Sequence, residues 1–115
     1  MAKIIQRGDI WIINLELSSH REMHKKRPAL VISNNIIHEK TYHVIVIPIS
    51  SQVSKTIGPE MVLIGKKEGL DKQSAALPIF IRSIDQERLV KKIGNLTEAK
   101  LLEVEGSLRL ILQLD

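Results

Sequence analysis

A short polar segment between two apolar stretches holds most of the side chains that could carry out chemistry. Its ionisable members are His20, Arg21, Glu22, His24, Lys25, Lys26 and Arg27. The segment contains four Lys or Arg side chains and one carboxylate, and the whole chain has a formal net charge of +4. This balance favours an anionic partner such as nucleic acid, with a solvated loop as the alternative. Arg27 suits a phosphate best, because Pro28 and the strand expected after it fix its backbone, and a guanidinium can hold two phosphate oxygens.

Polar residues also follow the apolar run 44–49, where the end of a strand would leave them accessible. They are Ser50, Ser51 and Gln52. No Gly-x-Ser-x-Gly elbow surrounds Ser50, so we do not expect a hydrolase triad, and ordinary turn chemistry is the alternative for this serine.

The pair His20 and His24 has the i, i+4 spacing that holds a metal ion on a helix. Here the pair lies in an expected loop, and Arg21 stands where the zinc-protease pattern has glutamate. Solvated loop histidines are the simpler interpretation, and acid–base cleavage of RNA by the pair ranks behind it. Asp9, Asp71 and Asp85 are scattered along the chain. We therefore expect no metal and no cofactor.

Composition narrows the class of protein. The chain has 115 residues, 43% of them hydrophobic, and no cysteine, which excludes disulfides and thiolate metal sites. This length predicts a single domain over residues 1–115. No apolar run approaches the roughly 18 residues of a membrane span, and the first residues show no secretory signal. We expect a cytoplasmic protein with no membrane partner.

The expected elements are mostly short strands, separated by Gly, Pro, Ser and Asn. They cover residues 10–15, 28–33, 44–49, 61–64, 75–81 with a break or edge at Pro78, and 89–93. Helical turns are expected at 34–40 and at 85–88, the latter with Asp85 as its N-cap. One clear helix begins at Thr97, with an apolar stripe of Leu101, Val104, Leu108 and Ile111, and Gly106 within it is expected to permit close packing. The pattern predicts a mainly β, α+β fold: a small antiparallel sheet or barrel followed by a C-terminal helix. Trp11, within the first strand, is expected in the core.

These residues, in this order, resemble the MazF/PemK toxins, the ribonuclease components of toxin–antitoxin pairs. The matching segments are Arg7 to Trp11 with Asn14 and Leu15, Glu22 before Arg27 to Ser33, Ile47 to Gln52, Gly69 and Leu70, Ser74, Ala76 and Leu77, Ile81 to Asp85, and Arg88 and Leu89. The resemblance implies an SH3-like barrel of the MazF/CcdB-like toxin fold, a homodimer, and a cognate antitoxin as partner. It also implies sequence-specific, metal-independent cleavage of single-stranded RNA.

The resemblance also assigns site residues. Glu22, Arg27 and Ser50 fall where the family carries its functional Glu, Arg and Thr, so Ser50 keeps the hydroxyl and lacks the methyl. The expected RNA-binding residues are Arg21, His24, Lys25, Lys26, Ser51, Gln52 and Arg82. Ile79 and Phe80 stand where the family has an Asp-Gln pair.

The implied reaction uses the substrate's own 2′-OH as nucleophile and leaves a 2′,3′-cyclic phosphate and a 5′-OH. In it, Arg27 would stabilise the charge on the phosphate oxygens, Ser50 would hydrogen-bond the 2′-OH, and Glu22 would accept a proton or orient Arg27. The main alternative is a non-catalytic toxin of the same fold that poisons a protein such as DNA gyrase, as the CcdB toxins do. A third possibility is an RNA-binding domain without catalysis.

Overall fold

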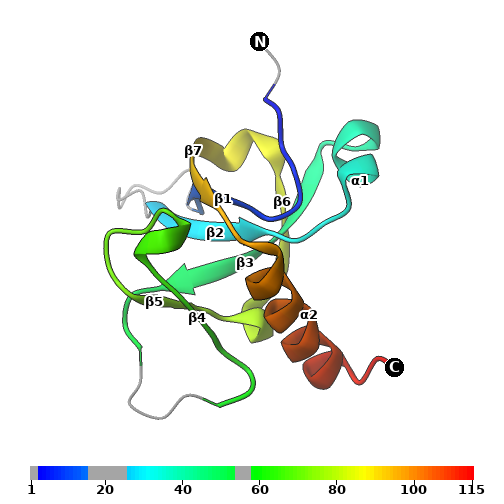
Figure 1. Ribbon diagram of the computed structural model, residues 1–115. Coiled ribbons are helices and arrows are strands. Elements are labelled where there is room, and N and C mark those ends of the chain that lie inside the picture. The colour runs from blue at the N-terminus through cyan, green and yellow to red at the C-terminus, as the bar shows by residue number, and fades with distance from the viewer. Residues whose placement is uncertain (1–2, 16–25, 54–57) are drawn as a thin grey trace.

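Antiparallel pairing organises the chain. The computed structural model describes residues 3–15, 26–53 and 58–115. Its strands are β1 Asp9–Asn14, β2 Lys26–Val31, β3 His43–Ser50, β4 Val62–Ile64, β5 Ser74–Ala76, β6 Arg82–Asp85 and β7 Leu89–Asn95. Two α-helices, α1 Asn35–Lys40 and α2 Glu98–Leu112, and three 3₁₀ turns, η1 Lys66–Glu68, η2 Pro78–Phe80 and η3 Gln86–Arg88, complete the described part of the chain. The expected antiparallel fold with a C-terminal helix is confirmed (Figure 1).

The long strand β3 curves the sheet into a half-barrel. The strand order is β4-β5-β3-β2-β1-β7, and β6 also pairs with β3. One edge of β3 pairs with β2. Its other edge takes β6 near its start, at Val46 opposite Arg82, and β5 near its end, at Ile49 opposite Ala76. Because two different strands share that edge, the sheet bends over at β3 and gains a second layer.

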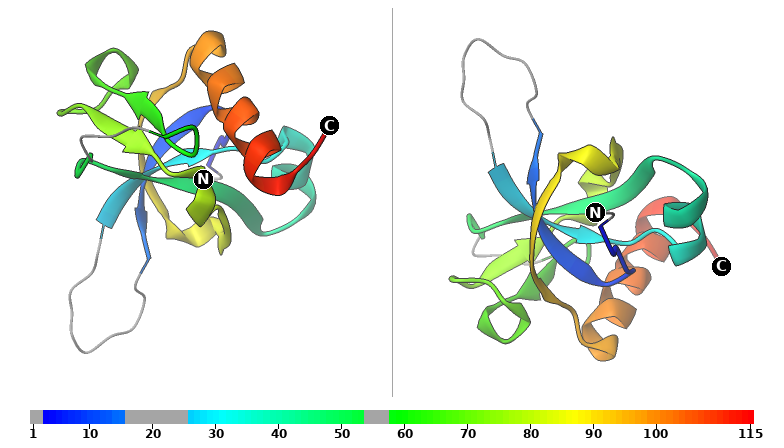
Figure 2. Two further views of the ribbon diagram at one scale, coloured as in Figure 1. Left: turned by 90° about the horizontal axis from the view of Figure 1, so that it is seen from below. Right: turned by 90° about the horizontal axis from the view of Figure 1, so that it is seen from above.

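Apolar residues cover both faces of the sheet, since successive side chains on a strand point to opposite sides. In β1, Ile10 joins the cluster beneath α2, β4 and Leu70, whereas Trp11 and Ile13 join the cluster with Ile84 and Leu89 on the other face. Figure 2 shows α2 and the β4–β5 hairpin on one side of β1, β2 and β3, with η3 on the other. The expected burial of Trp11 is confirmed.

Trp11 is held by a buried carboxylate. The Oδ2 of Asp9 accepts from the indole Nε1 at 3.3 Å and from the backbone N–H of Gln6 at 2.9 Å. The Lys92 Nζ lies 3.2 Å from the Asp9 Oδ1. A buried carboxylate needs such donors and a counter-charge to offset its desolvation. Asp9 therefore fixes the start of β1 against β7.

The helix α2 follows its predicted pattern. Thr97 is the N-cap, and its side chain accepts from the backbone N–H of Lys100 at 3.2 Å. Val104 is fully buried, and Leu101 and Leu108 pack against the core. The expectation for Gly106 is wrong: it faces outward, and a Cβ built on it meets nothing within 4 Å. Within the described residues, no helix is long and apolar enough to cross a membrane.

The turn after β4 is clamped against β7 by two glycines. Gly69 has φ +106°, and a Cβ on it would lie 2.4 Å from the Ile93 carbonyl oxygen. A Cβ on Gly94 would lie 2.0 Å from the Glu68 carbonyl oxygen. The buried Glu68 side chain closes the turn by accepting from the Gly65 N–H at 2.8 Å. Only glycines allow this approach, so the turn is tied to the neighbouring strand.

The strand predicted over residues 75–81 is too long, although the break expected at Pro78 is confirmed. Pro78 begins η2, so the strand ends at Ala76, and a separate edge strand, β6, follows at Arg82–Asp85. Only Ile84 is buried in β6, which leaves too little alternation to mark it as a strand. The expected turn after Asp85 forms as η3, but the Asp85 side chain makes no cap hydrogen bond.

Candidate functional site

Strand register brings Arg27 and Ser50 together, although they are far apart in sequence. β2 and β3 pair Ala29 with Pro48 and Val31 with Val46. Continued by two residues toward the start of β2, the same register brings Arg27 opposite Ser50. Both side chains lie on the sheet face that carries Ala29 and Val31, because residues two apart on a strand share a face. The two predicted residues therefore meet at one end of the sheet.

A pocket of about 410 Å³ opens at this end of the sheet. Its lining residues are Lys26, Arg27, Pro28, Ile49, Ser50, Ser51, Gln52 and Ser74. We call it the Arg27 pocket. It combines two cations with three hydroxyl groups and one amide, and its described lining contains no carboxylate. Such a set suits a phosphodiester, which needs positive charge and several hydrogen-bond donors.

Arg27 is exposed at the second position of β2, opposite the fully buried Ile13 of β1. The strand fixes its backbone, as the sequence predicts. Arg27 forms no ion pair with any residue that the structure describes. Its guanidinium is therefore available to a ligand as far as these residues are concerned.

Ser50 is half-buried at the last position of β3. Its Oγ accepts a hydrogen bond from the backbone N–H of Gln52 at 3.1 Å. That contact occupies one lone pair of the oxygen and leaves the hydroxyl proton free to be donated. Ser50 is therefore oriented as a hydrogen-bond donor at the mouth of the pocket, and the turn that orients it also brings Ser51 and Gln52 to the same pocket.

The structure brings some of the predicted site residues together in the Arg27 pocket. Lys26, Ser51 and Gln52 join Arg27 and Ser50 in the pocket. Glu22, Arg21, His24 and Lys25 lie outside the described residues, as does His20. Arg82 is separate: it lines a different hollow on β6, together with His43, Asp85 and Arg88.

Ser74 is a pocket residue that was not predicted as part of the site. β5 pairs Ala75 with Ser50, so Ser74 follows next to the end of β3. It is almost fully buried, and its Oγ donates to the Lys72 carbonyl oxygen at 3.0 Å. The sequence carries no signal for this position beyond its place in the family resemblance, because the β3–β5 register is set by tertiary structure.

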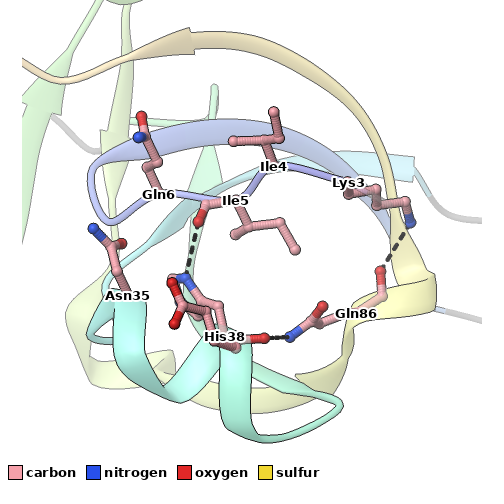
Figure 3. Close-up of a pocket in the computed structure, with 8 residues that line it drawn as sticks. Lys3, Ile4, Ile5, Gln6, Asn35, His38 and Gln86 are labelled. Atoms are coloured by element: carbon pink, nitrogen blue, oxygen red, sulfur yellow. Dashed lines mark hydrogen bonds between the residues drawn. The ribbon is translucent and has the colours of Figure 1, made fainter. Parts of the chain in front are cut away.

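A pocket of about 290 Å³ lies elsewhere, between the N-terminal segment, α1 and η3 (Figure 3). Its polar groups bond one another. The His38 Nδ1 donates to the Ile5 carbonyl at 3.1 Å, the Gln86 Nε2 donates to the His38 carbonyl at 3.0 Å, and the Lys3 Nζ donates to the Gln86 carbonyl at 2.9 Å. The His38 Nε2 lies 2.6 Å from the Ser33 Oγ. These contacts tie three segments together, so this pocket is a structural junction.

No acidic or histidine side chain from the described residues lines the Arg27 pocket. Throughout the described ranges, no group of three or more His, Cys, Asp or Glu side chains is arranged to hold a metal ion. The chemistry available from the described part of this pocket is cationic and hydroxylic.

Comparison with known proteins agrees with the geometry. Residues 6–112 match the family model described as PemK-like, MazF-like toxin of type II toxin–antitoxin system. The endoribonuclease MazF9 of Mycobacterium tuberculosis is 30% identical over 116 residues, covering 96% of this chain and 98% of its own. The endoribonuclease MazF of Staphylococcus epidermidis is 34% identical over 113 residues, covering 97% and 94%.

A solved structure shares the fold. The MazE–MazF crystal structure (Form-II) from Deinococcus radiodurans superposes with a TM-score of 0.84 at 23% identity, covering 99% of this chain and 100% of that one. At 23% identity, this structural similarity supports the fold alone. The family model and the two relatives extend over nearly the whole chain, including both strands that form the Arg27 pocket. The chain therefore belongs to the PemK-like, MazF-like toxins of type II toxin–antitoxin systems.

Proposed function

We propose that this protein is an endoribonuclease toxin that cuts single-stranded RNA at the Arg27 pocket. The observation that carries the proposal is the register of β2 and β3, which brings Arg27 opposite Ser50 in a pocket of cations and hydroxyls. The two relatives described above, each named an endoribonuclease, support it. A phosphodiester held there meets a forked cation and an oriented hydroxyl at the same time.

The proposed reaction is attack by the substrate's 2′-OH on the adjacent phosphorus. The O2′–P bond forms, the P–O5′ bond breaks, and the products are a 2′,3′-cyclic phosphate and a 5′-OH. One proton leaves the 2′-OH and one reaches the departing O5′. Negative charge grows on the non-bridging oxygens, and preorganised donors accelerate such a step most when they face that charge. Arg27 takes this role, because its planar fork can bind two oxygens and it stays protonated.

Ser50 and Glu22 have the supporting roles. Ser50 hydrogen-bonds the reacting 2′-OH through its hydroxyl, which the Gln52 N–H orients from the other side. A neutral hydroxyl is a poor base, so the proton goes to another group. Glu22 is the candidate acceptor, or else it orients Arg27. Lys26, Ser51 and Gln52 would bind the RNA backbone in the pocket, with Arg21, His24 and Lys25 of the neighbouring segment and Arg82 farther along the chain.

The assembly we propose is a homodimer with a cognate antitoxin as its partner, in the cytoplasm. The family description, a toxin of a type II toxin–antitoxin system, supports the antitoxin. Ile79 and Phe80, which are 54% and 60% exposed on η2, leave apolar surface for a protein partner to cover. Light scattering at micromolar concentrations should give the mass of two chains, and a monomeric mass would rule out the dimer.

Cleavage in EDTA tests the proposed function most directly. A mixed-sequence RNA should be cut at full rate without divalent metal and yield cyclic phosphate ends. The same sequence with deoxyribose at the scissile position should bind through its phosphates and remain intact. Loss of cutting in EDTA, or cutting of the deoxy substrate, would reject the internal nucleophile. If neither nucleic acid is cut and DNA gyrase is inhibited instead, the protein is a non-catalytic toxin.

A further inference from the structure

The Arg27 pocket continues into a second hollow of about 300 Å³. The two hollows share Pro28, Ser51 and Ser74, so they form one groove around the end of the sheet. The second hollow, which we call the Asp71 pocket, also includes Asp71 and Lys72. The Asp71 pocket therefore adjoins the place where a phosphate would lie at Arg27.

The floor of the Asp71 pocket is apolar. Ile12 and Pro28 are a cross-strand pair of β1 and β2. Leu70 approaches from the turn after η1, and Ile93 from β7. These residues lie at the edge of the core beneath α2, where Ile12, Pro28 and Ile93 remain only half-buried. Partly exposed apolar side chains give the flat face of a base a surface to pack on, as they do in other base-binding pockets.

The rim of the pocket is polar and follows a fixed turn. Asp71 and Lys72 follow Leu70, which comes directly after Gly69, and Gly69 is pressed against Ile93 and Gly94 of β7. The Ser74 Oγ donates to the Lys72 carbonyl, so the backbone is held on both sides of Asp71 and Lys72. A site that discriminates between bases needs its polar groups on such a rigid support.

The charge of Asp71 is unusual for its location. Of the described residues that line either hollow, Asp71 is the only carboxylate, and Lys26, Arg27 and Lys72 are the cations. Asp71 is exposed and forms no hydrogen bond or ion pair with another described residue. A carboxylate repels phosphate, so this side chain does not serve the RNA backbone. It can only accept hydrogen bonds, and the donors that RNA offers to it are the 2′-hydroxyl groups of the riboses and the N–H groups of the bases, of which only the bases differ from one nucleotide to the next.

We propose that the Asp71 pocket is a base-recognition subsite that selects guanine next to the cleaved bond, an inference that rests on the proposed function. Guanine presents O6, N1–H and N2–H₂ side by side, an acceptor followed by two donors. The Asp71 carboxylate can accept from N1–H and N2–H together, while the Lys72 ammonium donates to O6. Cytosine and adenine offer only one donor group, beside an acceptor, and uracil offers one donor between two acceptors, so none of them can donate to the carboxylate from two neighbouring nitrogens as guanine does.

Mapping the cut ends of a mixed-sequence RNA tests the subsite. Wild-type protein should show strong enrichment of guanine at one nucleotide flanking the cut. Asp71→Asn keeps the shape but turns an amide toward the donors of guanine, and it should lower that enrichment about tenfold or more, as expected for loss of a bidentate contact. Glu87→Gln, an equal loss of charge on exposed η3, is the matched control and should keep the wild-type pattern. Absence of guanine enrichment at both flanking nucleotides, or its persistence in Asp71→Asn, would overturn the proposal.

Binding separates failure of the subsite from failure of the nuclease. Five-nucleotide single-stranded DNA probes, all thymidine except for one central base, keep the bases and phosphates but lack the 2′-OH. Fluorescence anisotropy should show about tenfold tighter binding of the central-guanine probe, and Asp71→Asn should abolish that difference. If this preference is found but no RNA is cut, the subsite stands and the nuclease proposal falls. If RNA is cut while all probes bind equally, the subsite proposal falls alone.

Discussion

Arg27 is the residue on which the proposed chemistry depends most. It is exposed and makes no ion pair with a described residue, so its loss should affect turnover and leave folding intact. Arg27→Ala should lower the initial rate on a defined RNA about 10²- to 10³-fold or more, as expected when a donor to the developing charge is removed. Arg27→Lys should also be impaired, because one ammonium cannot reproduce the fork. Circular dichroism checks that each variant is folded.

Arg109→Ala is the matched control for Arg27. Arg109 is exposed near the end of α2, and its Nη1 donates to the carbonyl oxygen of Asp115 at 3.2 Å, well outside the groove. This variant should cut RNA at the wild-type rate. A folded Arg27→Ala protein that matched the control would remove Arg27 from the mechanism.

Ser50 separates the contribution of a hydroxyl from that of a side-chain shape. Ser50→Ala removes the acceptor of the Gln52 N–H and the donor to the substrate, and should reduce cleavage about 10²-fold. Ser50→Thr keeps the oxygen and should retain most of the rate. Single-turnover kinetics on one RNA would measure both. Equal activity of the alanine and threonine variants would mean that the hydroxyl has no role.

Replacing either of two glycines by alanine should change the free energy of unfolding, in opposite directions. Gly94→Ala brings a Cβ within 2.0 Å of the Glu68 carbonyl oxygen, so η1 must move from β7. We expect a loss of about 1–3 kcal/mol in the free energy of unfolding. Gly106→Ala adds a methyl group where nothing lies within 4 Å, inside a helix, and should gain about 0.5–1 kcal/mol. Urea denaturation of both variants measures the contrast, and a stable Gly94→Ala protein would show that the crossing is loose.

The elements show how far sequence reasoning reaches. The helix from Thr97 and the strands around Trp11, Leu30 and Ile47 were predicted because a cap and apolar patterning are local signals. β6 was missed because an edge strand with one buried residue, Ile84, carries almost no pattern. η1 was not predicted either, since its stability comes from contact with β7 and from the buried carboxylate of Glu68.

The candidate site was harder to predict than the fold. Arg27 was selected from its residue type and its place before Pro28, and Ser50 through the family resemblance. What brings them together is the register of β2 and β3, which no local pattern fixes. The same limit explains Ser74, which β5 delivers to the pocket, and Arg82, which lies in a separate hollow on β6. Residue types indicate which chemistry is available, whereas the pairing of the strands decides which residues lie in the same site.

The charge of the whole molecule leads to a prediction about salt. The net charge is +4, and Lys26, Arg27 and Lys72 lie along the groove. If Lys26 and Arg27 neutralise two phosphates while Lys72 contacts a base, raising salt from 50 to 200 mM should weaken binding about sevenfold for RNA and for the matching DNA alike. Anisotropy titrations at several salt concentrations give the slope. Binding that does not respond to salt would show that the groove is not the nucleic-acid surface.

The pairing of β1 with β7 has a consequence for how the protein matures. Asp9 lies opposite Asn95, so the first strand acquires one of its two neighbours only when nearly the whole described chain is available. Closing so large a loop costs conformational entropy before the strand contacts that stabilise it can form. Proteins dominated by such distant pairings fold in milliseconds to seconds. During synthesis, the strand that carries Arg27 emerges early, but the sheet that supports it stays incomplete until residues 89–95 have been added. On the proposed function, a nascent chain would therefore cut no RNA until residues 89–95 have joined the sheet.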